Sequence, residues 1–193
     1  MRITMLRHGR TAWNAERRIQ GHTDIPLSEE GRNALEGLRL PPELDAEVWV
    51  SSPLQRATET ARILSGGRPF ATDARLMEMN FGDWEGNTHT DLMATDPQGM
   101  HNSEARGMHM RPPNGETPAE VATRLLDFLT GREEPKLVLV AHKGVIRAAL
   151  ARASGWDMTS DPPFAIKWHM AQTFTLDEDR LRIDRLNIPL VAA

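Results

Sequence analysis

The sequence contains no cysteine, and this absence excludes disulfide bonds, thiolate metal sites and a cysteine nucleophile. It also lacks an apolar run long enough to span a membrane and a long apolar segment after a basic start. We therefore expect no membrane partner and a cytoplasmic location. The formal net charge of −4 argues against a nucleic-acid partner, although it allows a local basic pocket.

The length of 193 residues suffices for one sizeable core, and we expect a single domain over residues 1–193. Residues 87–115 are rich in Met, His, Gly and Pro and have weak periodicity, which predicts a partly helical cap inserted above the sheet. Their histidines, His89, His101 and His109, lack the spacing and the neighbouring cysteines typical of metal ligands. We therefore expect neither a metal nor a cofactor.

Short apolar runs alternate with amphipathic segments along the chain, which predicts an α/β fold with a mostly parallel sheet. The runs that predict strands are 3–6, 48–50, 69–72 and 136–141, and an edge hairpin is predicted from 172–176 and 180–186. Helices are predicted over 28–40, from 53 to the glycines at 66–67, over 117–130 and over 145–153. Ser28 and Thr117 are the expected N-caps of the first and third of these helices.

The first predicted strand ends on Arg7 and His8, directly before Gly9. Open α/β sheets place their chemistry at this edge, outside the carboxyl ends of the strands. A second arginine, Arg56, follows the next predicted strand. Two guanidinium forks suit the doubly charged phosphoryl group of a phosphomonoester. A neutral imidazole, with an ordinary pKa of about 6.5, offers a lone pair that can accept the phosphoryl group.

Four segments, at 6–14, 51–57, 78–86 and 141–147, occur in the order found in one known family. Through these four segments the chain resembles the histidine phosphatase superfamily, also called the phosphoglycerate mutase-like family, from about Arg2 to Arg147. The resemblance implies a three-layer α/β/α fold and a phosphohistidine on His8. It also implies a phosphate pocket lined by Arg7, Arg56 and His142, with Asn14 as a further donor.

A phosphatase also needs a proton donor for the leaving alcohol, and the resemblance implies that Glu78 is this general acid. Glu85 is the rival carboxylate, and its spacing favours a structural role. The turn-rich stretch that contains Gln20 and Gly21 predicts a loop over the site, so both are expected to contribute to substrate binding.

Two departures from the family pattern are visible. Lys143 stands directly after the second histidine, where family phosphatases usually have glycine. It would strain the turn if that position requires a positive φ, and otherwise it adds a cation at the rim of the substrate site. In addition, the family's Gly-x-x-Gln-Ala helix occurs here as residues 31–35 without the glutamine, which affects local packing more than chemistry.

Three functions remain open from the sequence. The first is a metal-independent phosphomonoester hydrolase that acts on a small-molecule substrate. The second is a cofactor-dependent phosphoglycerate mutase, which the short tail from Asn187 to Ala193 disfavours because less of the site would be closed to water. The third is an inactive relative that serves as a binding module. Residues 114–117 resemble a substrate-wall segment of α-ribazole and broad-specificity phosphatases, and whether Glu116 faces the pocket is left open, as is a homodimer.

Overall fold

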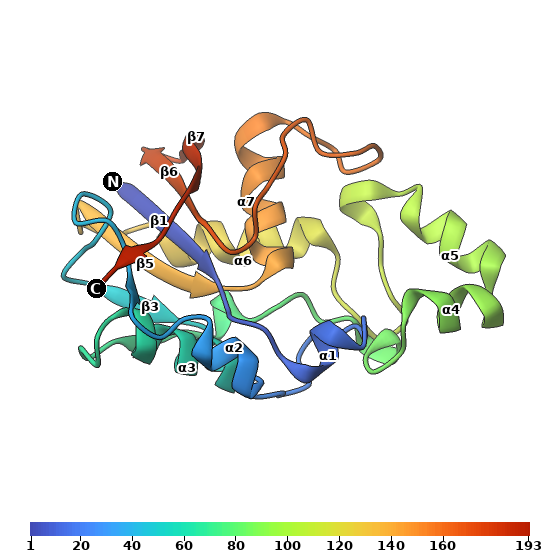
Figure 1. Cartoon of the computed structure of the whole chain (residues 1–193). Coiled ribbons are helices and arrows are strands. Elements are labelled where there is room, and N and C mark those ends of the chain that lie inside the picture. Colours follow the sequence, from blue (N-terminus) through green and yellow to red (C-terminus); the bar gives the residue numbers. More distant parts are fainter.

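The computed structural model describes all residues from 1 to 193 and contains a six-stranded central sheet (Figure 1). The strand order is β4-β3-β5-β1-β6-β7, in which β4, β3, β5 and β1 are parallel to one another and β6 is antiparallel to both of its neighbours, β1 and β7. The bounds are β1 Arg2–Arg7, β3 Trp49–Ser51, β4 Ala71–Thr72, β5 Lys136–Ala141, β6 Ala171–Asp177 and β7 Arg180–Ile188. The predicted parallel strands and the edge hairpin are confirmed.

The helices connect these strands and cover both faces of the sheet. Their bounds are α1 Ala12–Ala15, α2 Glu29–Asn33, α3 Gln55–Leu64, α4 His89–Thr95, α5 Pro97–Glu104, α6 Pro118–Leu129 and α7 Lys143–Ser154. Three short 3-10 helices are η1 Ala74–Leu76, η2 Gly82–Trp84 and η3 Gly107–His109, and a small second sheet pairs β2 Leu38–Arg39 with β8 Val191–Ala192.

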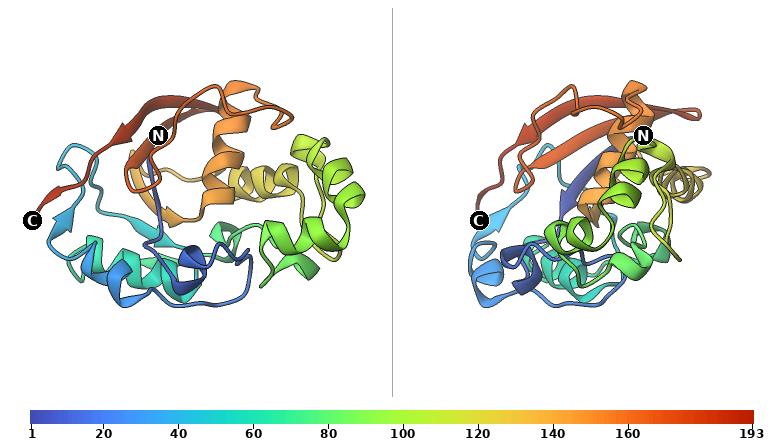
Figure 2. Two further views of the ribbon diagram at one scale, coloured as in Figure 1. Left: turned by 45° about the vertical axis from the view of Figure 1, so that its right-hand side comes forward. Right: turned by 90° about the vertical axis from the view of Figure 1, so that its right-hand side faces the viewer.

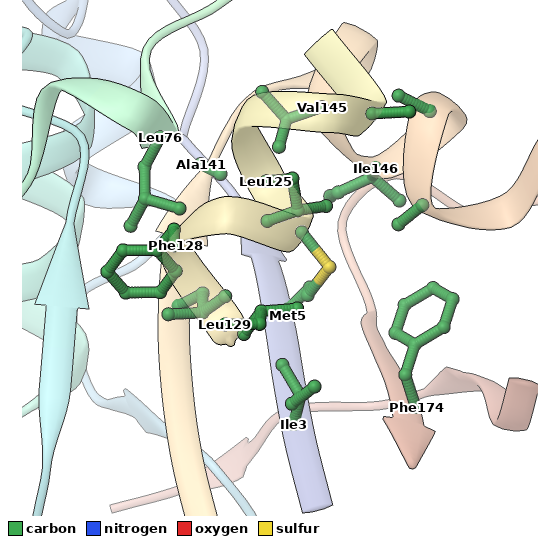
Figure 3. Close-up of a cluster of buried hydrophobic side chains, with 14 of the residues drawn as sticks. Ile3, Met5, Leu76, Leu125, Phe128, Leu129, Ala141, Val145, Ile146 and Phe174 are labelled. Carbon is green, nitrogen blue, oxygen red and sulfur yellow. The ribbon is translucent and has the colours of Figure 1, made fainter. Parts of the chain in front are cut away.

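Each face of the sheet has its own apolar core, because successive side chains of a strand point to opposite faces. In β5, Leu137 and Leu139 pack with α6 and α7, whereas Val138 and Val140 pack with α3. Figure 3 shows the first of these cores, where Phe128 of α6 lies beside Leu76 and Leu129 and the cluster continues to side chains of the sheet and of α7. The predicted three-layer α/β/α arrangement is confirmed.

The predicted helix over residues 28–40 is wrong in its length. Ser28 does cap α2, since its hydroxyl accepts a hydrogen bond from Gly31 N at 3.0 Å. The helix nevertheless ends at Asn33, and Gly37 turns the chain with a φ of +72°. Leu38 and Arg39 then pair with the C-terminal strand β8. A partner more than 150 residues away along the chain therefore overrides the local helical pattern, which sequence periodicity cannot reveal.

The segment 87–115 contains α4, α5 and η3, as its composition suggested. Figures 1 and 2 show α4 and α5 side by side, beyond the carboxyl ends of β1 and β5. That is the edge of the sheet where Arg7 and His8 lie. The division of the chain into one domain with this cap insertion stays a prediction. None of the helices combines the length and the apolar character needed to cross a lipid bilayer.

Truncating the core aromatic Phe128 should cost much of the stability, because its side chain is only 1% exposed. We expect Phe128→Ala to lower the free energy of unfolding by about 3–5 kcal/mol, from lost burial plus the cavity that remains. Urea unfolding of the two proteins measures this difference. Val191→Ala is the control, because Val191 is 40% exposed and should change the value by less than about 0.5 kcal/mol. Equal effects of the two substitutions would contradict this description of the core.

Candidate active site

His8 follows β1 and is held by contacts on both sides of its own peptide. Its N–H donates to Ala141 O of β5 at 3.0 Å, and the next residue, Gly9, donates its N–H to Thr60 Oγ1 of α3 at 2.9 Å. The His8 Nδ1 atom lies 2.6 Å from Gly9 O. Because a carbonyl oxygen can only accept, Nδ1 carries the ring proton and Nε2 keeps its lone pair.

The surroundings of His8 favour this neutral form. Its side chain is buried, and burial lowers the pKa of His8 well below the usual 6.5, with Arg7 and Arg56 lowering it further. The imidazole is therefore unprotonated at neutral pH. A neutral ring with a free Nε2 lone pair is the form that can attack phosphorus.

His142 lies next to His8, with 5.1 Å between the ring centroids. It follows β5 and is the N-cap residue of α7. Its Nε2 atom lies 2.8 Å from Ser52 Oγ, and its buried Nδ1 atom has no partner in the protein. Ser52 Oγ already accepts from Leu54 N at 3.3 Å, so its hydroxyl proton is available to donate to Nε2, and in that tautomer Nδ1 carries the ring proton. Burial lowers the pKa of His142 well below its usual value, and the neighbouring His8 and Arg56 lower it further. The residue is thus a second neutral imidazole at the same edge of the sheet.

Arg56 lies in the first turn of α3 and is fully buried, and its guanidinium group binds the backbone of the loop of residues 20–27. Its Nη2 atom donates to Gly21 O at 2.7 Å, and its Nη1 atom donates to Thr23 O at 2.9 Å. The Nε atom is buried and makes no hydrogen bond. Arg56 therefore fixes the loop with two of its five N–H groups and leaves the others for a further partner.

Unpartnered buried polar atoms concentrate at this site. The complete set in the protein is Arg7 Nε, Gln20 Oε1, Arg56 Nε, Ser103 Oγ and His142 Nδ1. Four of the five belong to residues that the sequence assigned to the site. Since buried polar groups nearly always find a hydrogen-bond partner, three free nitrogens on two guanidinium groups and an imidazole indicate a place prepared for an anion.

Glu78 is buried beside this cradle and is held at the start of α7. Its carboxylate accepts hydrogen bonds from Met79 N at 2.9 Å and from Gly144 N at 3.2 Å. A Cβ atom on Gly144 would overlap the Glu78 carboxylate, so only glycine lets the carboxylate approach this closely. The charge of Glu78 acts on both Arg7 and Arg56, because it opposes the lowering of the pKa of each guanidinium by burial.

Glu85 is used for a different purpose. Its carboxylate accepts hydrogen bonds from His22 N, Thr23 N and Thr23 Oγ1 at 2.6–2.8 Å and from Phe81 N at 3.1 Å. Gly21, at a φ of +53°, passes so close that a Cβ atom there would overlap this carboxylate. The contacts with Gly21, His22 and Thr23 tie the loop over the site to the segment that carries Glu78, and the contact with Phe81 lies within that segment. Glu116 likewise binds Arg124, at 2.7 and 3.0 Å.

Asn14 and Lys143 each belong to the start of a helix, and each keeps polar groups that form no hydrogen bond within the protein. The Asn14 side-chain oxygen accepts from Thr11 N at 3.0 Å as part of a capping box, while its amide NH₂ has no protein partner. Lys143 is the first residue of α7 and does not have a positive φ. The alternative in which this lysine strains the turn is therefore wrong. Its Nζ atom lies 5.5 Å from the centre of the Trp168 ring.

Sequence reasoning missed several residues that hold the site together. Ser52 fixes the ring of His142, Thr60 fixes the turn after His8, and His22 Nε2 lies 2.8 Å from Glu78 O. Trp168 borders a cavity of about 460 Å³ beside His8. Only Ser52, a polar residue directly after a buried strand, carries a local signal that could have indicated its role.

Fold and site together define an α/β protein in which a neutral imidazole lies with buried, unpartnered guanidinium nitrogens at the carboxyl edge of the sheet. The family model described as histidine phosphatase superfamily (branch 1) matches residues 3–189. The chain belongs to this superfamily, as the four sequence motifs predicted.

Relatives of this chain include proteins named as phosphatases, as phosphoglycerate mutase-like and as probable phosphoglycerate mutases. The glucosyl-3-phosphoglycerate phosphatase of Mycolicibacterium vanbaalenii is 35% identical over 176 residues, which is 83% of this chain and 77% of the relative. The adenosylcobalamin/alpha-ribazole phosphatase of Escherichia coli is 31% identical over 176 residues, covering 88% and 84%. A solved mycobacterial glucosyl-3-phosphoglycerate phosphatase in complex with VO3 is 30% identical, with a TM-score of 0.79 and coverage of 97% and 98%.

Burial of His8 and His142 should make stability depend on pH. Both pKa values are lowered in the fold, so below about pH 6.5 the unfolded chain binds more protons than the folded one, and stability is lost as the pH falls. Each histidine should contribute about 1.4 kcal/mol per pH unit below that point. We expect the His8→Asn/His142→Asn double variant to show a flatter dependence in urea unfolding without phosphate. The exposed His89→Asn control should keep the wild-type slope, and an unchanged slope in the double variant would contradict the buried neutral pair.

Proposed function

We propose that this chain hydrolyses small phosphomonoesters through a covalent phosphohistidine on His8. The observation that carries the proposal is the set of buried, unpartnered nitrogens on Arg7, Arg56 and His142 around a neutral imidazole. Membership of the superfamily supports the reaction class. Among the related structures, one mycobacterial phosphatase was solved with VO3 and again with inorganic phosphate, which supports binding of a phosphate-like anion.

When the charged phosphomonoester occupies the site, Glu78 takes up the proton that it needs as general acid. In the first step His8 Nε2 attacks phosphorus, the P–O ester bond breaks, and Glu78 gives this proton to the leaving alcohol oxygen. Arg7, Arg56 and His142 donate hydrogen bonds to the phosphoryl oxygens, whose charge is spread over the group in the transition state. In the second step the ionised Glu78 takes a proton from water, the water oxygen attacks phosphorus, and the P–N bond breaks. Phosphate and free His8 are the result.

Asn14, Gln20, Gly21 and Lys143 complete the proposed substrate site. The free amide NH₂ of Asn14 and the unpartnered Gln20 Oε1 support a contact with substrate. Gly21 contributes by closing the loop over Arg56. The mutase alternative uses the same phosphohistidine and differs only in whether water or a second hydroxyl group receives the phosphoryl group. Because one relative is named phosphoglycerate mutase-like, the experiment below also measures transfer of the phosphoryl group to phosphoglycerate.

Replacing the nucleophile should abolish turnover. We expect His8→Ala to lower kcat on para-nitrophenyl phosphate by at least about 10³-fold, because no other group can carry the phosphoryl group. Rapid quenching with ³²P-labelled substrate should give an acid-labile, alkali-stable label in the wild type and none in the variant. His89→Ala is the control and should keep both. A His8→Ala protein within tenfold of wild-type activity would remove the proposal, and label transfer to added phosphoglycerate faster than to water would replace hydrolase by mutase.

Removing the proton donor should matter most for poor leaving groups. We expect Glu78→Gln to slow hydrolysis of glycerol phosphate by about 10²–10⁴-fold, and that of para-nitrophenyl phosphate much less, because nitrophenolate leaves without a proton. Gly144→Ala should act in the same direction by displacing the Glu78 carboxylate. Glu85→Gln is the comparison and should affect both esters alike, since Glu85 holds the loop. A leaving-group dependence seen with Glu85→Gln and absent with Glu78→Gln would exchange the two roles.

A further inference from the structure

A second, smaller cavity of about 210 Å³ lies against α7 on the side of Lys143. Its walls include two cationic side chains and four large apolar ones, namely Lys143, Arg147, Trp156, Phe164, Ile166 and Trp168. We call it the two-cation pocket. Its volume is below that of a typical whole-ligand site, which indicates a subsite for part of a ligand.

Neither cation in this pocket is paired. Lys143 and Arg147 make no hydrogen bond or ion pair with any protein group, and each lies over a tryptophan, with Arg147 Cζ 4.8 Å from the centre of the Trp156 ring. Burial lowers the pKa of Arg147, and the negative charge of Asp161 opposes this shift, although Arg147 and Asp161 form no ion pair. Aromatic walls hold the cationic groups in place without neutralising them.

This arrangement is unfavourable for the protein alone. Lys143 and Arg147 are four residues apart on α7, so like charges lie one turn apart on the same side of the helix. Lys143 also lies in the first turn, where the helix dipole favours anions over cations. Burial lowers the pKa of Lys143 and Arg147 lowers it further. A negatively charged group bound between the two side chains would remove each of these costs.

The two-cation pocket is adjacent to the phosphate cradle. Lys143 directly follows His142, and its charge interacts with those of Arg7 and Glu78. Glu78, which binds Gly144 N, marks the side from which the leaving alcohol departs in the proposed reaction. Arg147 is one helical turn further on, a rise of about 6 Å. Trp168 borders both this pocket and the cavity beside His8.

We propose that the two-cation pocket binds the alcohol part of the substrate, and that this alcohol carries a second anionic group, a carboxylate or a phosphate, held between Lys143 and Arg147. The apolar body next to that group lies against Trp168 and Phe164. This inference rests on the proposed phosphatase function and names its substrate class. A phosphomonoester with an uncharged alcohol would leave both cations unpaired and is a poorer substrate.

The test compares two phenyl esters that differ only in charge, 4-carboxyphenyl phosphate and the amide 4-carbamoylphenyl phosphate. We expect the ratio of their kcat/KM values to fall by about 10–100-fold in Arg147→Met, the effect of losing a charge-assisted hydrogen bond. The change in the ratio on mutation cancels any difference in leaving-group chemistry. Arg147→Lys, which keeps the charge, should retain a preference for the carboxylate. The ester 1,4-phenylene bisphosphate, tested against the same amide, decides whether phosphate is preferred to carboxylate.

Arg152→Met is the matched control, because Arg152 is an exposed arginine on the same helix that also lacks an ion pair. It should leave the ratio unchanged. Titration of tryptophan fluorescence with 4-carboxybenzylphosphonate and its amide gives the same comparison without turnover, so it decides the inference even if no ester is hydrolysed. Lack of turnover in every ester would count against the proposed function. Equal binding of acid and amide, or a ratio unaffected by Arg147→Met, would overturn the two-cation pocket as an anion site.

Discussion

At the carboxyl edge of the sheet, the protein buries polar nitrogens for which it provides no hydrogen-bond partner, and the other features of the site are arranged around them. Arg7 Nε, Arg56 Nε and His142 Nδ1 are buried without acceptors, although an unpaired buried donor costs about 1–3 kcal/mol. Three separate strands bring these groups there, since Arg7 ends β1, Arg56 follows β3 and His142 follows β5. The parallel pairing of β1 and β3 with β5 is what makes the three strand ends coincide.

The same constraint explains the surrounding residues. Glu78 lies close enough to Arg7 and Arg56 to offset part of the positive charge, and glycine at position 144 lets its carboxylate reach the start of α7. Glu85 and the two terminal nitrogens of Arg56 hold the covering loop by its backbone. Burial keeps His8 neutral by lowering its pKa, and the two guanidinium groups act in the same direction because they would repel a cationic imidazole.

Several elements of the fold and several site residues could be predicted from short stretches of the sequence. The unbroken apolar run of β5 and the capping box at Thr117 each specify their element within a few residues. The order of motifs indicated that His8 and His142 belong together, and their rings lie 5.1 Å apart. Long-range pairing escaped prediction, since β2 exists only because β8 lies beside it. Trp168 was missed because it acquires its role from Lys143 on another element, and the local signal of Ser52 does not reveal that its partner is His142.

The central claim is that an anion supplies the acceptors missing around Arg7, Arg56 and His142. ¹⁵N-edited NMR tests it most directly, because the Nε–H signals of Arg7 and Arg56 and the Nδ1–H signal of His142 can be followed while inorganic phosphate is added. The account predicts that all three signals shift together with one saturation curve, in the direction of stronger hydrogen bonding. Saturation of the protein with phosphate while these three signals stay in place would contradict it.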